Sequence, residues 1–209
     1  MTTTTSPMTA ILLSIRPGTR RKIGDVFVER TGNYYRINGS SHTLEKAAAL
    51  IPMPQAKSKT DPLPDGIGEI LTFPDELRAM SVHGPWAYMI TKGYKLEEYR
   101  TKATKLRGWI LIHCSQSKDS DDFILDYKLP KATIDKMRGK IIGAAHVDDC
   151  YFMPEDDCYA YELSQAMLFE PKFWMPAKGQ QSIFWAASGD PERMAAFGRA
   201  WQLIEAQAQ

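Results

Sequence analysis

The sequence has few cysteines, no long apolar run and almost no net charge. Its three cysteines among 209 residues cannot form a complete set of disulfides, which favours a reducing compartment. No apolar stretch approaches the length that crosses a bilayer. The first ten residues, MTTTTSPMTA, lack a basic start followed by an apolar segment, so they do not resemble a secretory signal. We therefore expect a cytoplasmic protein that does not contact a membrane.

The formal net charge of +1 conceals an uneven distribution along the chain. Residues 81–118 carry seven Lys or Arg against two Asp or Glu, whereas residues 119–209 carry nine against fifteen. A locally positive face can attract a polyanion even where the whole chain is nearly neutral. Charge alone favours the simpler interpretation, in which the mixed charges fold against one another.

The chain divides into two parts by composition. Residues 1–75 predict an N-terminal extension made of a disordered tail, a β-hairpin from strands at 25–29 and 34–37, a short helix at 44–51 capped by Thr43, and a proline-rich linker at 52–66. The arginines of this hairpin either extend a nucleic-acid surface or form the solvated stripe of a docked appendage. A protein partner could also bind through this N-terminal unit.

Residues 76–209 predict one larger α+β domain. A helix from Pro85 to Lys92 ends at Gly93, because glycine readily takes the left-handed conformation at a helix C-terminus. Asp190 is placed to cap a last helix at 191–206. The remaining elements are a helix at 131–138 and strands at 96–100, 108–114, 140–147, 159–169 and 182–187. This order indicates a curled sheet or small β-barrel with flanking helices.

The densest group of functional side chains is the pattern Gly93-x-Lys95-x-x-Glu98-x-Arg100. In a regular strand Lys95 would point to one face and Glu98 and Arg100 to the other, but a bend after Gly93 would bring the three together. Lysine and arginine supply donors for phosphate, and a carboxylate between them can orient both.

Basic and aromatic residues flank this pattern, which is the combination that single-stranded nucleic acid requires. We predict a binding site in which Lys95 and Arg100 hold phosphate or base edges, Glu98 fixes Arg100 or accepts from a base, and Trp86 stacks. The candidates from this segment are His83, Trp86, Lys95, Glu98, Arg100, Lys102, Lys105 and Arg107.

These residues carry a resemblance to the ASCH domain, a branch of the PUA-like superfamily. Gly93, Lys95, Glu98 and Arg100 match the family motif. Three further elements follow the family order: Pro85 and Trp86 upstream, Arg107-Gly108-x-Ile110-x-Ile112 downstream, and Gly139 to Cys150 followed by Lys178, Gly179 and Trp185. The resemblance spans about residues 79–188 and implies a PUA-like β-barrel with flanking helices and a cleft that binds RNA or DNA. It adds Lys118 and Lys178 to the candidate binding residues.

The resemblance also keeps enzymatic alternatives open. One ASCH branch hydrolyses acetylated cytidine with a lysine and a threonine three residues later, but this chain has Glu98 at that position, which removes the activated hydroxyl. Ribonuclease activity is a further alternative, with Lys95 as the candidate catalytic residue. We favour binding without catalysis, RNA over DNA, and we expect no cofactor and no metal. The cysteine spacing fits no compact zinc site, and His113 is expected to be a satisfied buried histidine.

Overall fold

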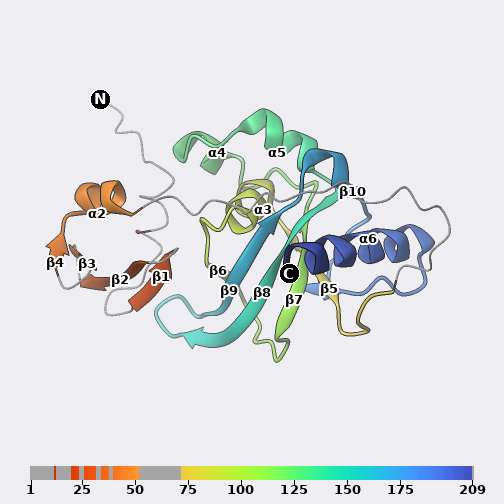
Figure 1. Cartoon of the computed structure of the whole chain (residues 1–209), viewed down its shortest axis with the longest axis horizontal. Coiled ribbons are helices and arrows are strands. Elements are labelled where there is room, and N and C mark those ends of the chain that lie inside the picture. The colour runs from red at the N-terminus through yellow and green to blue at the C-terminus, as the bar shows by residue number, and fades with distance from the viewer. Residues whose placement is uncertain are drawn as a thin grey trace.

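The computed structural model describes residues 12, 20–23, 26–31, 34–37, 40–51 and 72–208. The predicted polar tail, the turn residues Gly32 and Asn33, and the proline-rich linker lie outside the described residues. Two sheets are present, a four-stranded one in the N-terminal part and a seven-stranded one beyond it (Figure 1).

The N-terminal sheet is antiparallel, with its strands in chain order: β1 (Arg20–Ile23), β2 (Val26–Thr31), β3 (Tyr34–Ile37) and β4 (Ser40–His42). Thr31 lies opposite Tyr34, which confirms the predicted hairpin. Helix α2 (Leu44–Leu50) follows, as predicted, but the Thr43 side chain makes no capping hydrogen bond. Buried apolar residues from both sheet and helix form a small core that packs these elements together.

The larger sheet is mixed and strongly curled. Its strands are β5 (Arg78–Val82), β6 (Glu97–Arg100), β7 (Gly108–Cys114), β8 (Lys140–Met153), β9 (Cys158–Leu168), β10 (Met175–Pro176) and β11 (Phe184–Trp185). They run in the order β11-β5-β7-β8-β9-β6, with β10 beside β8, and only β5 and β7 are parallel among the described pairs. Register shifts within the β7–β8 and β8–β9 pairs bend the long strands. The result is a half-barrel, which bears out the expected α+β class.

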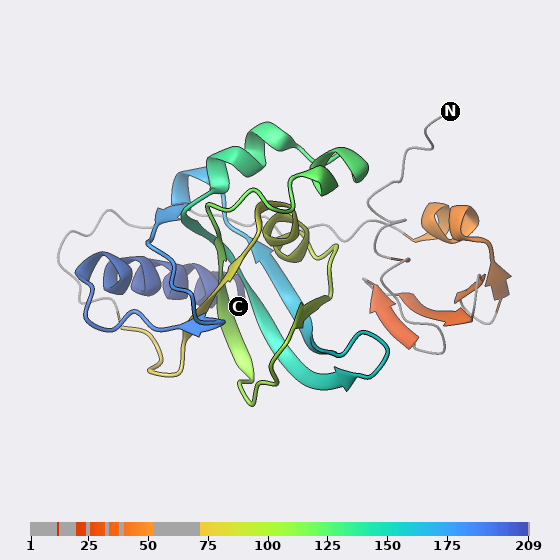
Figure 2. The same cartoon turned by 180° about the vertical axis from the view of Figure 1, so that it is seen from behind.

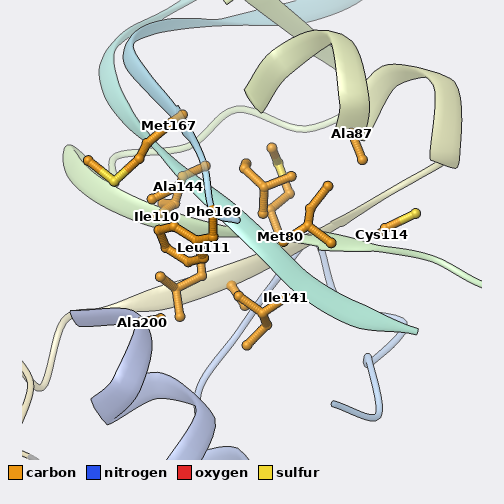
Figure 3. Packing of buried hydrophobic residues seen from close by; sticks show 14 of the residues in the cluster. Met80, Ala87, Ile110, Leu111, Cys114, Ile141, Ala144, Met167, Phe169 and Ala200 are labelled. Atoms are coloured by element: carbon orange, nitrogen blue, oxygen red, sulfur yellow. The ribbon is translucent and has the colours of Figure 1, made fainter. Parts of the chain in front are cut away.

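Helices cover both faces of this sheet. They are α3 (Gly84–Thr91), α4 (Asp122–Asp126), α5 (Lys131–Met137) and α6 (Pro191–Ala208), with a short 3-10 turn η1 (Pro171–Phe173). Figure 3 shows Ala87 of α3 and Ala200 of α6 on opposite sides of the strands, with the core residues between them. Residues 110–114 of β7 are therefore buried on both faces, which explains why this strand reads as a continuous apolar run.

Several element boundaries differ from the sequence-based expectation. Strand β8 continues to Met153 instead of ending at Val147, because it pairs with β9 along its whole outer half. The strand predicted at 182–187 shrinks to two residues, and β5 was not predicted at all. The predicted helix stops are confirmed, since Gly93 and Gly139 both have positive φ, +71° and +72°. Asp190 caps α6 by accepting from the backbone N–H of Glu192 at 3.0 Å.

Candidate functional site

A cavity of about 300 Å³ lies between helix α3, strand β6 and the end of helix α4. Its walls are mostly aromatic or apolar, and two oppositely charged side chains complete them. The lining residues are Trp86, Met89, Tyr94, Lys95, Glu98, Tyr99 and Tyr127. A volume of this size is at the lower end of the range for small-molecule sites.

The turn after α3 brings Lys95 to this cavity. Gly93 ends the helix, and the backbone N–H groups of Tyr94 and Lys95 both donate to the carbonyl of Met89, at 2.7 and 3.1 Å. Lys95 therefore precedes β6 and does not follow the side-chain alternation of that strand. Its ammonium lies 2.8 Å from Glu98 Oε2 and 4.7 Å from the centre of the Tyr99 ring. Of the arrangements that the sequence left open, a bend after Gly93 is the one present, and it brings Lys95 to Glu98.

Glu98 is the central member of the charged group. Its second oxygen, Oε1, forms an ion pair with Arg100 Nη2 at 3.0 Å, and the same nitrogen donates a hydrogen bond to the Ser81 carbonyl at 2.9 Å. The side chains of Glu98, Lys95 and Arg100 are 8%, 12% and 24% exposed. One carboxylate thus holds both cations, and the pair at the cavity wall, Lys95 with Glu98, is neutral. Arg100 itself does not line the cavity.

Two of the lining rings, Trp86 and Tyr127, pack together with Phe123, which does not itself line the cavity. The Trp86 ring centre is 4.6 Å from that of Phe123 and 6.0 Å from that of Tyr127. Trp86 comes from α3, whereas the other two come from α4 and its end. His83, the residue before α3, bonds through Nδ1 to Ser120 Oγ at 2.7 Å and does not line the cavity.

The remaining sequence-predicted residues lie outside the cavity. Lys102, Lys105 and Arg107 are exposed in the segment between β6 and β7, and Arg107 pairs with Asp149 at 2.7 Å. Lys118 and Lys178 are also exposed, after β7 and after β10. No ion pair within the described part of the chain involves Lys102 or Lys105.

Sequence reasoning missed four of the lining residues: Met89, Tyr94, Tyr99 and Tyr127. The signal for two of them was present, because Tyr94 and Tyr99 alternate with the motif residues. Tyr127 carried no such signal, since it reaches the cavity from a separate helix. Glu97 was also overlooked; it is buried and accepts hydrogen bonds from the hydroxyls of Tyr99, at 2.8 Å, and Tyr151.

A second polar group is buried on strand β7. His113 is 3% exposed, and its Nε2 donates to the Ala177 carbonyl at 3.0 Å, while Nδ1 pairs with Ser81 Oγ at 3.0 Å. Trp185 Nε1 donates to the same hydroxyl at 3.1 Å. Burial lowers the pKa of His113 to about 4. The histidine is thus a satisfied core residue, as expected, and Trp185 belongs to the core and not to the cavity.

Two features of the described residues concern metal sites and membrane-spanning helices. Within ranges 20–23, 26–31, 34–37, 40–51 and 72–208, no three His, Cys, Asp or Glu side chains gather as metal ligands would. The helices of the same ranges include none with the length and apolarity that a membrane span requires.

The comparisons identify the family. Residues 80–183, about half of the chain, match the family model described as ASCH domain. Through these residues the chain belongs to the ASCH domain family, as the motif suggested. Among solved structures, a crystal structure of a point mutant of ZmASCH from Zymomonas mobilis aligns with 62% of this chain and 97% of its own, at 11% identity and a TM-score of 0.37. Comparison with curated proteins gives no match.

Proposed function

We propose that the protein binds single-stranded nucleic acid, RNA in preference to DNA, and holds one unstacked base in the aromatic cavity. The observation that supports this most directly is the lining of the cavity. Four aromatic side chains surround a space that suits one planar ring, and base stacking on such rings contributes about 1–3 kcal/mol per base. Bases in a duplex are already stacked and paired, so a free strand is the expected ligand.

The charged wall of the cavity supports recognition of a base edge. Lys95 can donate to a base carbonyl and Glu98 can accept from an exocyclic amino group. Because Glu98 already neutralises Lys95 at 2.8 Å, this wall has little excess charge for phosphate. The exposed Lys102 and Lys105, which follow β6 directly, are better placed to pair with the backbone of a bound strand.

The amidohydrolase alternative has less support. No serine, threonine or cysteine is among the described lining residues, so the threonine hydroxyl that the amidohydrolase branch activates has no counterpart among them. Thr91, the threonine nearest in sequence to the motif glycine, is buried, and its hydroxyl donates to the Ala87 carbonyl at 2.8 Å.

The test separates the contribution of the cavity from that of the exposed Lys102 and Lys105. Fluorescence anisotropy would measure the affinity of labelled single-stranded RNA, single-stranded DNA and duplex at several salt concentrations. Tyr99→Ala removes one lining ring and should weaken binding by roughly 5- to 150-fold with an unchanged salt slope. The double variant Lys102→Gln, Lys105→Gln should instead reduce the salt slope by about 1.4, at about 0.7 per phosphate contact.

Lys172→Gln is the matched control, because this lysine is 58% exposed and lies on η1, away from the lining residues. It should change neither affinity nor slope. The proposal fails if the wild-type protein binds none of the three ligands at low salt, or if Tyr99→Ala binds as tightly as wild type. Cleavage of the labelled RNA that Lys95→Met abolishes would replace binding with the ribonuclease alternative.

A further inference from the structure

Tyr94 lies where three parts of the molecule meet. It lines the cavity, it packs beside a cluster of buried residues between α3 and α4, and it packs against the core of the N-terminal unit, the described residues between 12 and 51. Leu96 also packs against that core but does not line the cavity. The buried members of the N-terminal core are Leu12, Val28, Tyr35, Ile37, Ala47 and Ile51.

Residues 93–96 are the short connection from α3 to β6. Two backbone hydrogen bonds to Met89 hold the start of this connection, and the Tyr94 ring meets the edge of the Tyr88 ring at 6.4 Å. Burial raises the pKa of the Tyr94 hydroxyl, in keeping with its packed position. Figures 1 and 2 both place the N-terminal sheet beside the β6 side of the large sheet. The connection therefore has the domain core on one side and the N-terminal core on the other.

We propose that the N-terminal unit is a positioning element of the cavity, which acts by packing on Tyr94 and Leu96. This inference rests on the proposed function for its ligand but not for its contacts. Four short strands and a seven-residue helix bury little apolar surface by themselves, so the unit gains stability from docking. Docking in turn restricts the connection that carries Tyr94 and Lys95. A ligand in the cavity and the docked N-terminal unit should therefore stabilise each other, because such coupling is reciprocal.

The experiment uses full-length variants of strand β3. Ile37 is 6% exposed and belongs to the N-terminal core, whereas Tyr34 on the same strand is 57% exposed. Ile37→Ala should undock the unit, and Tyr34→Ala is the control. Hydrogen exchange would be followed at the amides of Tyr94 and Lys95, and oligonucleotide affinity by anisotropy. We expect exchange at least about fivefold faster and affinity at least about fivefold weaker in Ile37→Ala, with the control like wild type.

Leu96→Ala provides a second route, because it removes the docking contact from the domain side and leaves the N-terminal core intact. It should reproduce both effects. The inference is overturned if exchange in residues 26–51 accelerates in Ile37→Ala while the two amides and the affinity stay at wild-type values. If wild-type protein binds no oligonucleotide, the proposed function fails, but the exchange rates still decide whether the N-terminal unit restrains the connection. Conversely, wild-type binding with unchanged exchange in both variants would refute only the coupling.

Discussion

Acid should destabilise this protein through His113. In the folded state both ring nitrogens are engaged, with Ala177 and Ser81, and the imidazole is 3% exposed. A second proton would sit in an apolar core and would force Ser81 to turn its hydroxyl away from Nδ1. Burial therefore lowers the pKa to about 4 from the ordinary value of 6.5, which the unfolded chain should keep.

The size of the effect follows from these two values. Above pH 6.5 the imidazole is neutral in both states, so its neutral contacts contribute fully to stability. Between 6.5 and 4 the unfolded chain binds a proton that the folded protein does not, so stability falls as the pH falls. At about 1.4 kcal/mol per pKa unit, lowering the pH from about 7 to about 4.5 should cost roughly 2–3 kcal/mol at this residue alone.

Urea unfolding of wild type and His113→Gln at the two pH values would measure this contribution. Glutamine can still donate to the Ala177 carbonyl but does not titrate. The variant will have lower stability at neutral pH, because it fits the site less well, but its loss on acidification should be smaller than that of wild type by the same 2–3 kcal/mol, roughly. Carboxylates titrate in both proteins and cancel in the difference. Equal losses in the two proteins would show that protonation of His113 does not oppose folding.

Two further changes test the packing around the site. Glu98→Gln leaves two largely buried cations without their carboxylate and should lower the free energy of unfolding, measured in urea, by about 3 kcal/mol. The control Glu205→Gln changes an exposed residue and should stay within about 0.5 kcal/mol of wild type. Equal unfolding midpoints for the two variants would contradict the central role of Glu98. Gly143→Ala would place a Cβ 2.1 Å from the Met167 carbonyl oxygen. We therefore expect the free energy of unfolding to fall by about 4 kcal/mol or more, or the protein to be insoluble. An unchanged thermal midpoint would refute the contact.

Local signals were enough to predict the elements that carry the motif. The helix from Pro85, its stop at Gly93 and the apolar strand at 108–114 all depend on residues within a few positions of one another. The bend that brings Lys95 to Glu98 was also foreseeable, because glycine after a helix predicts a positive φ. Strand β5 was not predicted, because it forms by parallel pairing with β7, about 30 residues away, and local sequence carries no signal for that pairing.

The aromatic wall of the cavity could not be predicted for the same reason. Trp86 lies on α3 and Tyr127 at the end of α4, and 30 residues separate the last residue of α3 from the first residue of α4. Only tertiary packing brings the two ring centres to 6.0 Å. Docking of the N-terminal unit on Tyr94 and Leu96 is still longer in range. Sequence reasoning left open whether this unit sits apart, because its hairpin and helix have the same local signals in either case.

The charge pattern of the motif was easy to count and hard to interpret. From the sequence alone, Lys95 and Arg100 were predicted to be two cations that can bind a phosphate. In the fold, Glu98 forms ion pairs with both of them, at 2.8 and 3.0 Å, and all three side chains are largely buried. If either cation moved to a phosphate, the Glu98 carboxylate would be partly unpaired in a poorly solvated place, which costs free energy. An exposed lysine loses less when it contacts a phosphate, because it gives up no buried partner. Under the proposed function, the residues that would recognise a base at the cavity wall therefore differ from those that would contact phosphates along the exposed segment after β6.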